Sequence, residues 1–220
     1  MIKIVDIHKT YQSLEVLKGV DFTIQNGEIM SIVGSSGAGK TTLLQIIGTL
    51  ETPTKGSVFF DEVDVFKLNE KKLAQFRNSE IGFIFQFHQL LPEFNALENA
   101  ILPALIKGVS KENAEQKAIE LFSILNIQHR ANHFPNELSG GEQQRVAIAR
   151  ALINQPKYVF ADEPSGNLDS QNAKELHQLF FDLRAKFGTA FIIVTHNEDL
   201  ANMADKKLVM KDGRLLKDAE

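Results

Sequence analysis

The sequence predicts an α/β fold in which a largely parallel β-sheet is covered by helices on both faces. Three short runs that are almost entirely apolar, at residues 29–33, 158–161 and 191–194, have the length and composition of strands buried inside such a sheet. A helical pattern lies between the last two runs, with its apolar stripe at Leu176, Leu179, Phe180, Leu183 and Phe187. Buried strands that alternate with helices predict a parallel sheet, because parallel neighbours need a long crossover connection.

The beginning of the chain predicts a small antiparallel sheet beside this core. Apolar residues at 2, 4 and 7 indicate a first strand, residues 9–13 a turn, and residues 16–24 a second strand that ends before the Asn26-Gly27 turn. Tyr11 falls in the predicted turn, where its ring could stack on a purine base or could simply be an ordinary turn tyrosine.

Residues 34–41 match the phosphate-binding pattern G-x-x-x-x-G-K-[ST] and lie between the predicted strand 29–33 and a helical run at 42–50. Glycines let successive backbone N–H groups point at a polyphosphate, and the following helix turns its positive end toward the same anion. We expect Lys40 to reach the terminal phosphates and the Thr41 hydroxyl to bind Mg²⁺. The alternative, a glycine-rich turn without a ligand, leaves the strand before it and the helix after it as a coincidence. The expected phosphate contacts are Gly34, Ser35, Ser36, Gly37, Ala38, Gly39, Lys40, Thr41 and Thr42.

The segment after the phosphate helix changes from strands to helices. Residues 56–60 predict a strand, residues 69–78 a polar helix, and residues 81–85 a strand that ends at Gln86. From residue 87 to 155 the pattern is helical, with Ala118, Leu121, Phe122 and Leu125 on one helix face. We therefore interpret residues 87–155 as a helical insertion. Residues 208–214 predict a last hairpin.

Four positions lie at the carboxyl ends of the predicted strands: Gly34, Gln86, Asp162 and His196. In parallel sheets ligands collect at the carboxyl ends of the strands, so we expect these positions to surround one site. Asp162 suits the acid that holds Mg²⁺ beside Thr41, and Glu163 is placed to deprotonate an attacking water. An Asp-Glu pair at a strand end is otherwise explained by helix capping or solvation, and the phosphate loop in the same chain favours the catalytic interpretation.

Residues 138–145, Leu-Ser-Gly-Gly-Glu-Gln-Gln-Arg, provide a second anion-binding signal. The Ser-Gly-Gly-Glu opening precedes a helical pattern that includes Val146, Ala149 and Ile153, which predicts a helix start with free backbone N–H groups.

Composition excludes several other classes of protein. The 220 residues contain no cysteine, which removes disulfides and thiolate metal sites, and the net charge of -4 argues against broad binding to nucleic acid. No apolar run approaches the roughly 18 residues needed to span a membrane. We expect a soluble protein whose role at a membrane, if it has one, comes through a partner.

Taken together, these motifs resemble those of the ATP-binding cassette (ABC) ATPases, and the resemblance covers the whole chain in the family's order and spacing. It implies a RecA-like phosphate-loop core with an antiparallel β subdomain, at residues 1–86 and 156–220, and a helical signature subdomain at residues 87–155. It also implies ATP and Mg²⁺ as ligands, with Tyr11 as the adenine-stacking aromatic and Gln86 as a metal ligand and catalytic residue beside Glu163 and His196.

In this family two cassettes face each other head to tail, with each ATP between the phosphate loop of one and the signature helix of the other. Carried over, the resemblance gives Ser139, Gly140 and Gly141 a role on the nucleotide of the opposite subunit, His196 a contact with the γ-phosphate, and Asp169 a contact across the dimer.

The segments 85–92 and 162–169 look like those of the bacterial subgroup that serves lipoprotein release, macrolide efflux and cell division, although Ser165 stands where this subgroup usually carries Thr. The resemblance thus implies an ATPase on the cytoplasmic side of the bacterial inner membrane that drives a permease docked near residues 86–99. A mechanical or signalling cassette without transport is the alternative. A small-molecule phosphotransferase would leave the signature segment and His196 unexplained.

Overall fold

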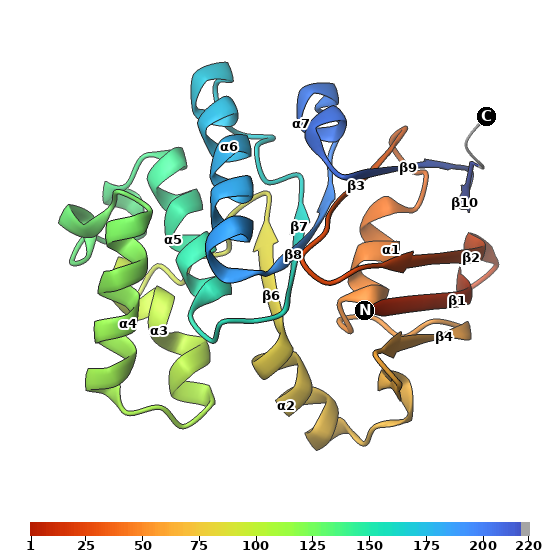
Figure 1. Cartoon of the computed structure of the whole chain (residues 1–220), viewed down its shortest axis with the longest axis horizontal. Coiled ribbons are helices and arrows are strands. Elements are labelled where there is room, and N and C mark those ends of the chain that lie inside the picture. The colour runs from red at the N-terminus through yellow and green to blue at the C-terminus, as the bar shows by residue number, and fades with distance from the viewer. Residues whose placement is uncertain (217–220) are drawn as a thin grey trace.

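In the computed structural model, which describes residues 1–216, a six-stranded sheet forms the centre of the molecule (Figure 1). Its strand order is β10-β9-β3-β8-β7-β6. The strands are β3 (Ile29–Gly34), β6 (Ile81–Phe85), β7 (Tyr158–Asp162), β8 (Ala190–Val194), β9 (Lys206–Lys211) and β10 (Arg214–Leu215). All neighbours are parallel except the β9–β10 hairpin, so the predicted parallel sheet and the predicted last hairpin are both confirmed.

A second, antiparallel sheet has the order β2-β1-β4-β5. It consists of β1 (Ile2–Tyr11), β2 (Leu14–Ile24), β4 (Lys55–Phe60) and β5 (Val63–Asp64). The turn between the first two strands is shorter than predicted. Tyr11 ends β1 and is paired with Leu14 of β2, so it does not lie in the turn. The reason is that Thr10 and Tyr11 have side chains that favour extended backbone.

Helices pack on both faces of the central sheet. Helix α1 (Lys40–Ile47) contacts strands of both sheets, whereas α6 (Ser170–Phe187) and α7 (Glu198–Met203) contact β8 and β3. Helix α1 begins two residues earlier and ends three residues earlier than predicted. Gly48 caps it and Thr49 has a φ of 64°, a conformation that stops a right-handed helix.

The strands divide the core into two layers, as period-two alternation requires. Val159, Phe191 and Ile193 belong to the cluster that joins the sheet to the helical part and α6. Phe160 and Ile192 belong to the cluster that includes α1 and the antiparallel sheet. Strands β7 and β8 are therefore packed against side chains on both faces of the sheet.

Three helices lie together beside the β6 edge of the sheet: α3 (Ala96–Ile106), α4 (Lys111–Ile124) and α5 (Gly140–Leu152) (Figure 1). Ala118, Leu121, Phe122 and Leu125 are buried, as their spacing predicts. Residues 87–95 of the predicted helical insertion are not helical, because Asn95 and Glu98 form a capping box that starts α3 only at Ala96. Helix α2 (Glu70–Glu80) precedes β6, and short 3₁₀ turns lie at Val65–Lys67, Gln128–Arg130 and Pro135–Glu137. Within residues 1–216, every helix is too short or too polar to cross a bilayer.

Candidate active site

The carboxyl ends of β3, β7 and β8 border a groove of about 440 Å³. It is lined by Leu14, Val16, Ser36, Gly37, Gly39, Lys40, Thr41, Thr42, Glu163 and His196. The structure thus brings the loop at residues 34–41 together with Glu163 and His196, which come from distant parts of the chain. These residues come together because β3, β8 and β7 are consecutive in the sheet and end at the same edge.

The loop is pressed against the C-terminal hairpin, which explains its glycines. A Cβ at Gly34 would lie 2.2 Å from the Met210 carbonyl oxygen, so no larger residue fits there. Gly39 has a φ of 96° and caps α1 in a left-handed conformation. The Gly213 N–H donates to the Ala38 carbonyl oxygen at 3.2 Å, and the Lys18 N–H donates to Gly213 O at 2.9 Å.

The start of α1 has the features of an anion site. Gly39 supplies no side-chain cap, and the first turn contains no acidic residue. The ammonium of Lys40, whose residue is 9% exposed, donates to the carbonyl oxygens of Gly34 at 2.8 Å and Ser35 at 3.1 Å. Carbonyl oxygens compensate only part of its charge. Uncapped N–H groups and a largely buried cation fit a polyphosphate.

Thr41 lines the groove and contacts Asp162, because Thr41 Oγ1 donates to Asp162 Oδ1 at 3.2 Å. Burial raises the pKa of the Asp162 carboxyl, and the Thr41 hydrogen bond and the charges of Lys40 and His196 oppose that rise. In the described part of the chain no three acidic, histidine or cysteine side chains gather as a metal cage. One hydroxyl and one carboxylate suit Mg²⁺, which usually keeps several waters and takes further oxygens from substrate phosphates.

Among residues 1–216, Glu163 is the only buried acidic residue. It has a φ of 47° and is 8% exposed, and its N–H donates to the Val194 carbonyl oxygen of β8 at 2.9 Å. His196 holds the carboxylate twice, through Nδ1 at 2.8 Å from Oε1 and through its backbone N–H at 3.3 Å from Oε2. Burial raises the pKa of Glu163, against the influence of His196 and Lys40, and nearby Asp162 adds to the rise. A buried carboxylate with a raised pKa is a stronger base than an exposed one.

Gln86 lies close to Asn167, which follows β7. The Asn167 side-chain amide donates to the Gln86 carbonyl oxygen at 2.9 Å, and Gln86 Nε2 donates to Asn167 Oδ1 at 3.5 Å. Among the hydrogen bonds of residues 1–216, none joins Gln86 to Thr41 or Asp162. The register nevertheless pairs Phe85 with Asp162 on neighbouring strands, so Gln86 follows at the same edge of the sheet.

Tyr11 does not line the groove. Its ring lies under the Lys9 ammonium, 4.8 Å from the centroid, and its hydroxyl donates to Glu51 at 3.4 Å. Leu14 and Val16 take part in the groove instead. Neither residue was predicted from the sequence. The predicted hairpin could have indicated Leu14, because Leu14 is the strand partner of Tyr11.

The signature segment lies outside this groove, at the start of α5. The prediction of free N–H groups is wrong for Glu142, because the Ser139 hydroxyl accepts its N–H at 3.3 Å. In return, the Glu142 carboxylate accepts the Ser139 N–H at 2.8 Å, which completes a capping box. The surface above Gly140 is open, since a Cβ there would meet nothing within 4 Å, whereas a Cβ at Gly141 would lie 3.7 Å from Asn172 Oδ1. Asp169 caps α6, accepting the N–H groups of Gln171 and Asn172 at 3.0 Å each.

Comparison with known proteins gives consistent relatives. The family model described as ABC transporter matches residues 17–166. The chain is 57% identical to the lipoprotein-releasing system ATP-binding protein LolD of Cytophaga hutchinsonii over 98% of this chain and 99% of that protein. It is 58% identical to LolD of Bacteroides thetaiotaomicron over 99% of this chain and 100% of that one.

Solved structures agree with the sequence relatives. The ATP-binding cassette MJ0796, a dimer in a post-hydrolysis state bound to ADP and Pi, superposes with a TM-score of 0.91 at 39% identity, covering 99% of this chain and 97% of that chain. The CbiO1 subunit from Clostridium perfringens, part of the transporter complex CbiONQ, gives a TM-score of 0.89 at 28% identity over 98% of this chain and 86% of that chain.

Proposed function

The chain belongs to the ABC transporter family, and on that premise we propose that it is the ATP-hydrolysing subunit of a lipoprotein-releasing system. The observation that carries the catalytic part is the position of Glu163, held by His196 beside the loop at 34–41. The observation that favours this cargo class is the near-complete coverage of LolD proteins at 57% and 58% identity.

Nucleotide phosphates are held by the loop and the start of α1. Backbone N–H groups of the loop surround the β- and γ-phosphates, and Lys40 exchanges its carbonyl partners for phosphate oxygens. Tyr11 and Leu14 flank the hairpin on the side where the adenine is expected. The proposed phosphate contacts are Gly34, Ser35, Ser36, Gly37, Ala38, Gly39, Lys40, Thr41 and Thr42.

Mg²⁺ is proposed at Thr41 and Asp162, with Gln86 as an additional ligand at the same sheet edge. When bound, the ion neutralises part of the charge on the phosphate oxygens. The chain's contribution is to present a hydroxyl and a carboxylate at a fixed separation.

Hydrolysis follows from the position of Glu163. A water oxygen attacks the γ-phosphorus, the bond from that phosphorus to the β–γ bridging oxygen breaks, and the water proton passes to the Glu163 carboxylate. His196 fixes the carboxylate through Nδ1 and leaves Nε2 for the γ-phosphate. Lys40 stabilises charge on the leaving ADP.

Catalysis is proposed to need two copies of the chain. Ser139, Gly140 and Gly141 complete the site of the opposite subunit, and the open surface above Gly140 supports this, because a phosphate can approach the backbone there. Asp169 is placed to contact the partner across the dimer. The dimeric solved structure of the relative MJ0796 supports the same assembly.

A membrane permease is proposed to dock at residues 86–99 and the adjoining groove of about 370 Å³. Phe87 is 75% exposed and Leu91 is 42% exposed, so the segment offers apolar side chains to a partner. Phe85, Ile106 and Arg150 line the groove beside them. Leu90 and Phe94 are half-buried and support the segment.

The docking segment is preorganised by one buried amide. Asn99, fully buried, accepts the Leu91 N–H at 2.8 Å and donates to the carbonyl oxygens of Leu91, Phe94 and Asn95 at 2.9–3.0 Å. A preformed surface binds its partner with less loss of conformational entropy.

We also propose that the chain divides into a core (1–86 and 156–220) and a helical signature subdomain (87–155). Its proposed position is peripheral, on the cytoplasmic side of the inner membrane.

The test is purification of the chain from native membranes with identification of what is bound. The proposal is supported if a permease co-purifies with the chain and if a lipoprotein stimulates the ATPase activity of the complex. A bound membrane protein that gives no lipoprotein release favours a mechanical or signalling role and would overturn the cargo assignment.

A further inference from the structure

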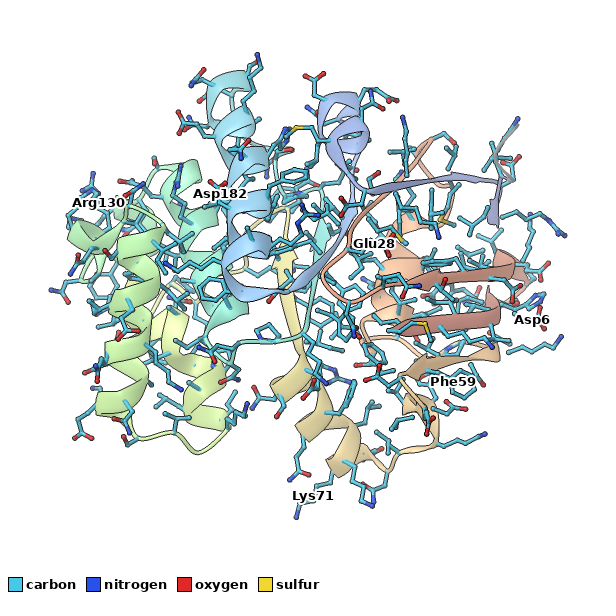
Figure 2. The ribbon with its side chains drawn as sticks, viewed as in Figure 1. Asp6, Glu28, Phe59, Lys71, Arg130 and Asp182 are labelled. Atoms are coloured by element: carbon cyan, nitrogen blue, oxygen red, sulfur yellow. The ribbon has the colours of Figure 1, made fainter. Side chains whose placement is uncertain are left out.

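The signature segment carries a carboxylate that the proposed function does not use. Glu142 follows Gly141 directly, and its Oε1 accepts a hydrogen bond from Arg130 Nε at 2.6 Å. The Glu142 side chain is 20% exposed and that of Arg130 is 34% exposed. Figure 2 shows Arg130 at the outer edge of the helical part, on the connection between α4 and α5.

Glu142 is held in its ionised form. Burial works against ionisation, but the hydrogen bonds from the Ser139 N–H and from Arg130 outweigh it and lower the pKa of the carboxyl. The capping box fixes this carboxylate at the first turn of α5. A full negative charge therefore stands beside the two glycines whose N–H groups face the proposed phosphate.

That charge is a problem for a shared nucleotide site. ATP brings several negative charges of its own, and like charges placed together across an interface weaken association. Arg130 is the nearest positive group to this carboxylate, with Nε 2.6 Å from Glu142 Oε1. The His129 side chain is farther away, with Nε2 4.0 Å from the same oxygen, and is 65% exposed to solvent. Guanidinium stays protonated at any pH that the protein tolerates.

Arg130 is itself fixed by the surrounding backbone. The carbonyl oxygens of Ala131 and His133 accept the N–H groups of Leu97 and Ala96 at 2.9 and 2.8 Å. A second arm of the guanidinium lies 3.3 Å from His133 Nε2. The residue is thus anchored to the start of α3, where the proposed docking segment ends.

We propose that Arg130 is a positioning residue for the shared ATP site, acting by neutralising Glu142 at the start of the signature helix. This inference rests on the proposed function, because it requires that Gly140 and Gly141 face the nucleotide of the opposite subunit. Arg130 itself touches neither ATP nor water.

The test measures ATP-dependent dimerisation by sedimentation, in a Glu163→Gln background that prevents turnover. Arg130→Gln is expected to weaken the dimer about tenfold, since the Glu142 carboxylate then lacks its guanidinium partner beside the proposed triphosphate site. The double change Arg130→Gln with Glu142→Gln is expected to restore dimerisation to within about threefold of the parent, because glutamine keeps the capping acceptor and removes the charge. Monomer affinity for ATP, measured in dilute samples, is expected to stay unchanged.

Arg184→Gln is the matched control, because Arg184 makes a similar pair with Asp205 at 2.5 Å and is 30% exposed. It should dimerise like the parent. The Arg130→Gln defect should also shrink in about 0.5 M salt, where charge repulsion is screened; a purely structural loss would not respond in this way.

The outcomes separate the inference from the function on which it rests. If Gly141→Asp dimerises like the parent, the shared site is wrong and the inference falls with it. If Gly141→Asp abolishes dimerisation but Arg130→Gln dimerises as tightly as Arg184→Gln, only the role of Arg130 is overturned. Failure of the double variant to recover, or a defect that is independent of salt, also overturns it. Glu142→Gln alone provides a check if Arg130→Gln folds poorly, since it should dimerise at least as tightly as the parent.

Discussion

Nδ1 of His196 lies 2.8 Å from Oε1 of Glu163, and the two residues follow the neighbouring strands β8 and β7. This contact fixes the direction of the carboxylate in the groove. It also determines which histidine nitrogen is occupied, so that Nε2 remains available on a side chain that is 71% exposed.

Glu163→Gln should trap the ATP-bound dimer. The amide keeps the shape of the carboxylate but cannot accept a proton, and loss of a general base typically removes about 10²- to 10⁴-fold of rate. ATP binding should persist. Steady-state phosphate release and calorimetric ATP binding measure both parts, and hydrolysis at the parent rate would show that Glu163 is not the base.

Lys40→Ala should weaken nucleotide binding and turnover together. The change removes the ammonium that Gly34 and Ser35 hold inside the loop, which is the nearest cation to the expected phosphates. A hydrogen bond to a charged group contributes about 1.5–3 kcal/mol, so the ATP dissociation constant should rise by about tenfold or more. Calorimetry with ATP checks this, and an unchanged affinity would contradict the assignment.

Gly141→Asp should spare ATP binding by the monomer and abolish dimerisation. The change places a second carboxylate, beside that of Glu142, at a helix start that must remain positive. Mixed with Lys40→Ala subunits, it should recover part of the activity, because a head-to-tail heterodimer keeps one intact composite site. Loss of ATP affinity in a dilute Gly141→Asp sample would instead assign the signature helix to its own subunit's site.

Tyr11→Ala should lower ATP affinity about fivefold if the ring stacks on adenine, and Tyr11→Phe should retain the parent affinity. The comparison variant is Leu14→Ala on the facing strand, since Leu14 lines the groove and Tyr11 does not. If only Leu14→Ala weakens binding, the adenine lies on the leucine.

The Arg130–Glu142 pair should give a measurable pH dependence of stability. The pKa of Glu142 is below its ordinary value of 4.5, so the stabilisation is present above that value and is lost as the pH falls through the lowered pKa. At about pH 7 the free energy of unfolding of the parent should exceed that of Glu142→Gln by no more than about 1 kcal/mol, because the pair is partly exposed. Thermal unfolding at about pH 7 and about pH 3 checks this. A difference that persists at the lower pH would contradict it.

The strands and the phosphate loop could be predicted because local composition decides them. Strand β6 has the predicted bounds, since its apolar run is bordered by a helix end and by Gln86. Tyr11 could not be placed, because β1 continues through residues 9–11 of the predicted turn, and each residue of register moves a side chain relative to the groove. The cap of Ser139 by Glu142 was missed for another reason. A serine followed three residues later by a glutamate is a capping signal, but its glycines were interpreted only as an anion site.

The loop at 34–41 rests on the last hairpin, through the close approach of Gly34 to Met210 and the Gly213–Ala38 hydrogen bond. During synthesis, Met210 and Gly213 leave the ribosome long after the loop itself. Until they emerge, the loop lacks both of these contacts. A chain truncated before Lys206 lacks both contacts, so we expect it to bind ATP more weakly than the parent.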